Sequence, residues 1–374
     1  MFDFNLKNYG FFELFVCIFL NVVGLIFIQS SVGEQLGSFM SQLSISIVSL
    51  ILCILISFLD LKIVLRRPFA FLIVCVSSLL VVFLLGTAYG RNSTRWFSLP
   101  IVNMAIQPSE FAKLFVILFL SKYIEKQDEM INRFSNLTKV VFFFSIPFLL
   151  IFFQPNLSSS LILFFIFFAM MFASKLKLRY IFGTIGAIVL MYLIIYLSVQ
   201  FGFLYRVPFL RDYQKNRIAS FFQPTEKDEG VYQQENSIIA IGSGKVLGKG
   251  INNTSNQSVK NGNWLAEAQN DFIFAVVGEE IGFLGSTIII LAYIFLIVSC
   301  LIIAEKQREY YKKLICVGVA TWIGVQSFIN IGVATSMIPN TGVPLPFFSQ
   351  GGSSLLSIYM AMGLVINIKR EVRV

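Results

Sequence analysis

The sequence predicts an all-α, polytopic integral membrane protein with about ten transmembrane helices and one long extracytoplasmic loop. Of its 374 residues, 56% are hydrophobic and 13% are charged, whereas about a quarter of the residues in a soluble domain are charged. We expect one membrane domain over residues 1–374, with the long loop at about 202–270, between the seventh and eighth helices. Apolar stretches near the roughly 20 residues that span a bilayer fall at about 10–30, 41–60, 68–88, 109–124, 138–154, 157–174, 180–201, 272–303, 314–334 and 350–368.

Local signals support the individual boundaries. The first apolar stretch follows a head with little basic charge and has no small-residue cleavage site, so we interpret it as a retained helix rather than a signal peptide. Pro108 and Ser109 are typical of a helix start and open the fourth stretch. Gln154, Pro155 and Asn156 separate the fifth and sixth stretches. A single kinked segment is the alternative there, but the combined length is too great for one crossing.

Basic residues lie in alternate connections between the expected helices, and this pattern predicts the orientation of the chain. With the N-terminus in the cytoplasm, the inner segments are rich in Lys and Arg and the short outer loops carry few. The positive-inside rule then places both termini in the cytoplasm and the long loop outside. The net charge of +9 fits cytoplasmic loops held against anionic lipid and does not indicate nucleic-acid binding.

The cysteine and histidine content excludes several kinds of site. The five cysteines fall inside apolar stretches at no metal-ligand spacing, so we interpret them as small hydrophobic residues. They are Cys17, Cys53, Cys75, Cys300 and Cys316. The chain has no histidine, which excludes histidine bases, Ser-His-Asp triads and most zinc sites.

Asp271 lies where the long loop meets the eighth helix. On a continuous helix, Ala275, Gly278, Gly282 and Gly285 share its face, and such a stripe of small residues permits close helix approach or lines a groove. The alternative is that Asp271 only caps the helix N-terminus.

Glu279 and Glu280 lie about 12 Å further along the same helix axis. Ionisable residues at that depth usually face protein or water, so packing against polar partners is one interpretation and a functional site is the other.

A second cluster joins the outer loop around Trp96 to the start of the fourth helix. Glu110 and Lys113 are three residues apart and share a helix face near the outer surface. They form either a local ion pair or a site in which the Lys113 cation meets an anionic headgroup. Trp96 alone is typical of an interfacial aromatic belt.

The long loop carries a third cluster, with Arg217 and the glycine-rich runs Ala240–Gly244 and Gly248–Gly250. The spacing excludes a phosphate-binding P-loop, because Lys249 is followed by Gly rather than Ser or Thr. Glycine-rich turns are the simplest interpretation, but Arg217 and Lys249 could bind an extracytoplasmic pyrophosphate. A fourth cluster follows Asn330, where prolines and glycines recur across 339–352 and predict irregular backbone that is buried in protein or lines a cavity.

These four clusters, in this order, resemble the SEDS family of RodA- and FtsW-type membrane proteins over nearly the whole chain. The resemblance implies an enzyme that polymerises the glycan strands of peptidoglycan from lipid II on the outer face of the bacterial cytoplasmic membrane. The two glycine-rich runs favour a RodA-type member. The matching motifs are Gln107–Lys113, Asp271–Val276 with Gly278–Glu280, and Pro344–Phe347 followed by Gly351–Ser354.

The resemblance also implies roles for individual residues. The family's essential acid falls on Asp271, which we predict to be the general base. We expect a substrate-binding set of Trp96, Glu110, Lys113, Arg217, Lys249 and Glu279.

Two motifs depart from the family pattern. Gln269–Asn270 stands where the family has His-Thr, so any role of that His or Thr is either not general in the family or absent here. Gln154–Asn156 replaces Gln-Pro-Asp, which puts a second acidic role there in doubt.

General chemistry agrees with these roles. A sugar hydroxyl is a poor nucleophile at neutral pH and needs a base, and a carboxylate is the natural choice in a chain without histidine. The departing lipid pyrophosphate needs positive charge, which Arg217, Lys249, Lys113 or a divalent cation such as Mg²⁺ or Mn²⁺ could supply. We expect no organic cofactor.

The resemblance implies four kinds of partner: lipid II, a class B penicillin-binding protein with transpeptidase activity, the elongation or division machinery, and membrane lipid. A lipid II flippase is the main alternative, because buried charges and broken helices also occur in transporters. No inverted repeat is visible, which is evidence against it. A structural scaffold is a third interpretation.

Overall fold

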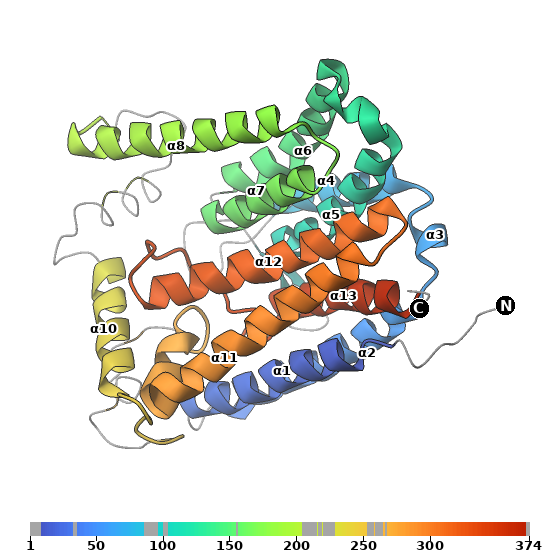
Figure 1. Ribbon diagram of the computed structural model, residues 1–374. Coiled ribbons are helices and arrows are strands. Elements are labelled where there is room, and N and C mark those ends of the chain that lie inside the picture. Colours follow the sequence, from blue (N-terminus) through green and yellow to red (C-terminus); the bar gives the residue numbers. More distant parts are fainter. Residues whose placement is uncertain are drawn as a thin grey trace.

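The protein is a bundle of long helices, seen in Figure 1 of the computed structural model. The structure describes residues 9–32, 36–85, 96–99, 104–154, 156–203, 215, 219, 229–252, 258, 265 and 268–371. Arg217 and most of the 202–270 loop lie outside the described residues. The helices are α1 (Phe11–Val32), α2 (Leu36–Ser57), α3 (Leu61–Val64), α4 (Pro68–Leu85), α5 (Pro108–Gln127), the 3-10 helix η2 (Asp128–Asn132), α6 (Phe134–Phe153), α7 (Leu157–Phe172), α8 (Leu178–Gln200), α10 (Glu229–Ser243), α11 (Ile273–Glu305), α12 (Tyr310–Ala334) and α13 (Gly352–Arg370).

Each of the ten apolar stretches contains one of these long helices, and α6 and α7 are separate, as expected. Seven described helices are long and apolar enough to cross a membrane. Pro68–Leu84 and Leu157–Phe172 are shorter apolar helices, and α5 carries Glu110, Lys113 and further charges. The multi-pass fold is therefore confirmed, and ten crossings remain a prediction.

The helices differ in how much of their side-chain surface is buried. Helices α5, α12 and α13 form the interior, where most side chains are buried. Helix α8 lies apart from the bundle in Figure 1 and exposes large apolar side chains, among them Phe182 and Val189. A short antiparallel pair, β1 (Phe97–Leu99) and β2 (Met104–Ile106), precedes α5 and was not expected from the sequence. All five cysteines are buried and free, as predicted.

Ion pairs gather at the end of the bundle where α1 begins and α13 ends. Glu13 on α1 pairs with Lys369 on α13, with its two carboxylate oxygens each 2.8 Å from Nζ. Partial burial raises the pKa of Glu309, but hydrogen bonds from Lys312 and Lys62 outweigh it and hold the pKa at about 2. The first and last described helices thus meet at one end, which is the arrangement that a shared side for both termini requires.

Helix α11 is broken at Gly282, where φ is 64° and ψ is −163°. In a continuous helix the N–H groups of Phe283 and Leu284 would donate to the carbonyls of Glu279 and Glu280. Here they donate instead to the carbonyl oxygens of Lys245 and Val246, at 2.9 and 3.1 Å. The vacated carbonyls of Glu279 and Glu280 accept from the N–H groups of Lys249 and Gly250, at 2.9 and 3.0 Å. The turn after α10 therefore inserts into the break and completes its hydrogen bonds.

Glycines make this insertion possible. A Cβ at Gly244 would lie 2.0 Å from the Gly278 carbonyl oxygen, and one at Gly248 would lie 2.2 Å from the Glu280 carbonyl oxygen. A Cβ at Gly282 would lie 2.4 Å from the Gly248 nitrogen. The sequence expectation of a small-residue face assumed a continuous helix, and that assumption is wrong at Gly282. Gly278 and Gly282 admit the α10 turn.

The insertion predicts a marked contrast between two glycines of the same turn. Both have positive φ, 82° at Gly248 and 97° at Gly250, but a Cβ at Gly250 meets nothing within 4 Å. Both alanine variants carry the left-handed strain of about 1–2 kcal/mol, and only Gly248→Ala adds a backbone clash. Thermal unfolding in detergent should give a lower Tm for Gly248→Ala than for Gly250→Ala. Equal Tm values would show that the turn does not seal the break.

Candidate functional site

The site centres on the irregular segment that joins α12 to α13, residues 335–351. Its backbone departs from regular structure, with φ of 68° at Gly342 and 62° at Phe347. Two side-chain amides of α12 hold it. Asn330 Nδ2 donates to the Val343 carbonyl at 2.7 Å, and Gln326 Nε2 donates to the Pro344 carbonyl at 2.9 Å. The expectation of irregular backbone buried in protein is confirmed.

Asp271 lies against this segment, at the start of α11. Its carbonyl oxygen accepts a hydrogen bond from Asn330 Nδ2 at 2.9 Å, and the Gln350 N–H donates to the Gln269 carbonyl at 3.0 Å. A Cβ at Gly342 would lie only 3.2 Å from Asp271 Oδ2. The N-cap residue of α11 is Phe272, so Asp271 does not occupy the capping position. The half-buried Asp271 is thus held through its backbone at the junction of loop and helix.

Helix α10 supports the segment from the side of the long loop. Gln234 Nε2 donates to the carbonyls of Val333 and Ile338, at 3.1 and 2.8 Å. Ser237 Oγ donates to the Ala334 carbonyl at 2.7 Å. These bonds satisfy carbonyls near the C-terminal end of α12, where helical partners run out. The same helix therefore sets the positions of the α11 break and of the segment beside Asp271.

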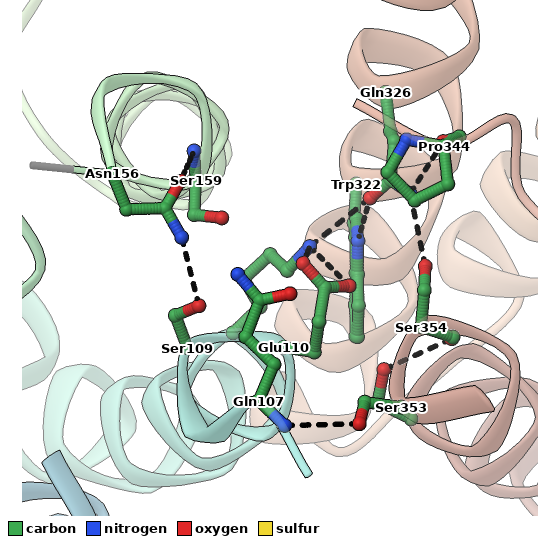
Figure 2. Close-up of polar contacts among 12 residues, drawn as sticks. Gln107, Ser109, Glu110, Asn156, Ser159, Trp322, Gln326, Pro344, Ser353 and Ser354 are labelled. Atoms are coloured by element: carbon green, nitrogen blue, oxygen red, sulfur yellow. Dashed lines mark hydrogen bonds and ion pairs between the residues drawn. The ribbon is translucent and has the colours of Figure 1, made fainter. Parts of the chain in front are cut away.

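Lys113 is the centre of a buried polar network among α5, α12 and α13. Figure 2 labels its partners Glu110 and Gln326, with Trp322 and Ser354. Its ammonium nitrogen lies 2.8 Å from both carboxylate oxygens of Glu110 and 3.1 Å from Gln326 Oε1. Gln326 Oε1 also accepts from Trp322 Nε1 at 2.7 Å, and its Nε2 donates to Ser354 Oγ at 3.2 Å. An ammonium group has three donors, and these three contacts use them. The geometry favours the ion-pair interpretation, and contact with a headgroup remains a prediction.

Trp96 immediately precedes β1 and is half-buried. The base of the β1–β2 pair is fixed to α13, because Ser353 Oγ accepts from the Gln107 N–H at 3.0 Å and lies 3.3 Å from the Ala105 carbonyl oxygen, to which it donates. Ser109 Oγ accepts from Asn156 Nδ2 at 3.0 Å, so the N-terminal ends of α5 and α7 also meet here. The second cluster and the fourth cluster are therefore joined.

Lys249 and Glu279 bind each other. Lys249 Nζ lies 2.7 Å from Glu279 Oε1, and Ser258 Oγ lies 3.2 Å from Glu279 Oε2. Glu280 accepts a 2.5 Å hydrogen bond from Ser30 Oγ of α1. This pairing gives Glu279 the polar partner that the structural interpretation expects, and it adds a side-chain bond to the sealed break of α11.

The structure thus brings together most of the residues that the sequence singled out, around the start of α5, the start of α11 and the segment 335–351. Sequence reasoning noted Asn330 without a role and missed Gln326. The sequence did carry a signal for both residues, because these two amides are four residues apart and lie on one face of a largely apolar helix.

Comparison with known proteins agrees with this architecture. Residues 11–374 match the family model of FtsW, RodA and SpoVE, described as cell cycle protein. Among similar proteins, the probable peptidoglycan glycosyltransferase FtsW of Buchnera aphidicola is 30% identical, over 86% of this chain and 83% of its own. Stage V sporulation protein E of Bacillus subtilis is 34% identical, over 81% and 78%.

Two solved structures share the fold. One comes from work titled "Structural coordination of polymerization and crosslinking by a peptidoglycan synthase complex", with a TM-score of 0.79, 23% identity and coverage of 97% and 98% of the two chains. The other is the rod shape determining protein RodA of Thermus thermophilus, with a TM-score of 0.72, 22% identity and coverage of 98% and 99%. Matched along nearly its whole length, the chain belongs to the SEDS family of FtsW-, RodA- and SpoVE-type membrane proteins.

Proposed function

We propose that the protein polymerises peptidoglycan glycan strands, transferring glycosyl units between lipid II-type substrates on the outer face of the bacterial cytoplasmic membrane. The observation that carries the proposal is the half-buried Asp271 at a loop–helix junction, whose backbone carbonyl is held by Asn330 and whose carboxylate lies beside Gly342. The names of the curated relatives, probable peptidoglycan glycosyltransferases, support the same activity. They support polymerisation over the flippase alternative.

The proposed reaction uses Asp271 as general base. Its carboxylate accepts the proton of an acceptor sugar hydroxyl as that oxygen bonds to the anomeric carbon of the donor sugar. The bond from the anomeric carbon to the lipid pyrophosphate breaks, and its electron pair leaves with the pyrophosphate oxygen. The proton remains on Asp271 until water removes it.

Positive charge for the departing pyrophosphate is the second requirement of this reaction. Lys249, whose side chain is 23% exposed, is better placed to reach a substrate than Lys113, whose side chain is 0% exposed. The family resemblance implies that Arg217 also contributes positive charge to the departing pyrophosphate. We assign Lys113, Glu110 and Glu279 to holding the site and Trp96 to its outer rim.

A divalent cation could be brought to the site by the substrate. No group of three or more His, Cys, Asp or Glu side chains that could hold a metal ion occurs in the described ranges. Mg²⁺ usually keeps several waters and is bound largely through substrate phosphates, so the pyrophosphate would supply most of its oxygen ligands and Asp271 keeps the role of base. When bound, the cation would neutralise charge on the pyrophosphate.

The proposed partner is a class B penicillin-binding protein, which would crosslink the strands. A structurally similar chain comes from a peptidoglycan synthase complex that coordinates polymerisation and crosslinking, which supports this partner. The sequence relatives include FtsW- and SpoVE-type proteins and the structural ones include RodA. Elongation, division and sporulation thus remain alternatives for the cellular role.

Asp271→Asn tests the base. The amide keeps the size of the side chain and removes its basic oxygen, so glycan synthesis from purified lipid II should fall about 10²-fold or more. Asp128→Asn is the matched control, because Asp128 pairs with Lys175 on an exposed surface. Near-parent synthesis by Asp271→Asn, in protein that inserts normally, would exclude Asp271 as the base and reopen the flippase interpretation.

Two variants separate the ion pair of α5 from a substrate role. Lys113→Met leaves the Glu110 carboxylate buried without its cation, which costs about 3–5 kcal/mol, and we expect poor folding and no activity. The double variant Glu110→Gln/Lys113→Met removes both charges and should restore the thermal stability. Glycan synthesis restored along with stability shows that the pair is structural. A stable but inactive double variant shows that the charges of this pair serve the reaction.

Cysteine labelling tests the proposed orientation. Glu235 on α10 and Lys306 after α11 are both exposed, and the five native cysteines are buried, so background labelling should be low. A membrane-impermeant maleimide applied to intact cells should label Glu235→Cys and miss Lys306→Cys until the membrane is opened. The reverse pattern would overturn the orientation.

A further inference from the structure

Two buried side-chain amides on α12 connect the Glu110–Lys113 pair with the region around Asp271. Gln326 and Asn330 are 0% and 1% exposed and lie one turn apart on the same helix face. Neither belongs to the proposed catalytic or substrate-binding set. Buried amides are costly unless their groups are hydrogen-bonded, so their contacts show what they hold.

Their contacts form a continuous path from Lys113 to Asp271. Gln326 accepts from Lys113 Nζ at 3.1 Å and donates to the Pro344 carbonyl at 2.9 Å. Asn330 donates to the Val343 carbonyl at 2.7 Å and, with the same nitrogen, to the Asp271 carbonyl at 2.9 Å. Val343 and Pro344 are consecutive, so the two amides donate hydrogen bonds to both carbonyls of one dipeptide from a single helix face, an arrangement we call the clamp. Figure 2 shows Gln326 and Pro344.

We propose that Gln326 and Asn330 are positioning residues, which hold the backbone of Asp271 and the Val343–Pro344 dipeptide, and so place the Asp271 carboxylate relative to the Glu110–Lys113 pair. This proposal rests on the proposed function, since it assigns these residues to the same reaction.

The local backbone explains why such a clamp is needed. The segment from Thr341 to Gln350 forms no helix or strand whose backbone hydrogen bonds would set its position. Gly342 of this segment passes beside Asp271 Oδ2. Loss of either amide would leave a buried carbonyl of the dipeptide without its donor, and the segment would shift toward another partner. A displacement of about 1 Å at a reacting group can cost about 10²-fold in rate.

Asn367 of α13 provides a matched control. It is 0% exposed, and its Nδ2 likewise donates to two carbonyls, those of Ile56 and Leu59, at 3.0 and 2.6 Å. Ile56 and Leu59 lie at the C-terminal end of α2, and Asn367 is in the last turn of α13, the turn that Lys369 ties to α1. Asn330→Ala and Asn367→Ala therefore remove equivalent bonds at opposite ends of the bundle.

The test measures glycan synthesis by the full-length protein in proteoliposomes, with purified lipid II as the probe. We expect Asn330→Ala to lower kcat about 10²-fold with little change in KM, because a misplaced base affects the reaction step more than binding. Asn367→Ala should lose similar thermal stability and keep the parent kcat. Equal losses of kcat in the two variants would overturn the proposal.

A double-variant cycle tests the clamp as a unit. Gln326→Leu removes the hydrogen bond to the Pro344 carbonyl, the other bond of the clamp. The double variant Gln326→Leu/Asn330→Ala should therefore be little slower than the slower single variant. Gln326→Leu/Asn367→Ala should show independent effects. Fully additive losses of activation free energy at Gln326 and Asn330 would show that they act separately and would overturn the shared clamp. Should Asn330→Ala fail to fold, Gln326→Leu carries the same kcat comparison.

A second readout separates this proposal from the proposed function. Hydrogen exchange of the 339–351 backbone in detergent needs no substrate, and it should quicken in Asn330→Ala and Gln326→Leu but not in Asn367→Ala. Unchanged hydrogen exchange at 339–351 in Asn330→Ala and Gln326→Leu would overturn the clamp, whatever glycan synthesis these variants show. A parent protein that makes no glycan from lipid II, with the exchange result intact, would reject the polymerase function and leave the clamp standing.

Discussion

The constraint that governs this structure is that backbone N–H and C=O groups inside a bilayer must find partners within the protein. Regular helices meet it by themselves, but two irregular pieces in the described part of the chain do not. One is the break of α11 at Gly282, which the turn after α10 completes with four backbone hydrogen bonds. The other is the segment after α12, which side-chain amides hold instead. The first solution depends on the loop before α11, and the second on α10 and on the helix that directly precedes the segment.

Helix α10 connects the two irregular pieces, and only the segment after α12 lies against Asp271. Helix α10 seals the α11 break and bonds to the end of α12. Asn330 bonds to the segment and to Asp271. A displacement of α10 would therefore affect both α11 and the segment after α12, the two elements that carry Asp271 and lie beside it. The long loop that contains α10 is in this sense part of the scaffold of the candidate site.

Much of this fold could be predicted from the sequence, because helix length and hydropathy are local properties. The ten apolar stretches match the helices, and the spacing of Glu110 and Lys113 anticipates their pair. The insertion of residues 245–250 could not be predicted, since the glycines that permit it do not by themselves show which backbone conformation they adopt. Gly282 fits a small-residue stripe equally well in a continuous helix. Lys249 and Glu279 are thirty positions apart, so no helical spacing connects them.

The sealed break of α11 has a consequence for how the chain tolerates changes in length. Surface turns usually accept insertions and deletions, because few bonds depend on their length. The turn from Gly244 to Gly250 is an exception, since both its ends are bonded to consecutive residues of one helix. One added or deleted residue would shift half of those bonds out of register and leave polar groups without partners. The length of this turn is therefore more constrained than the identity of its exposed side chains, such as Leu247.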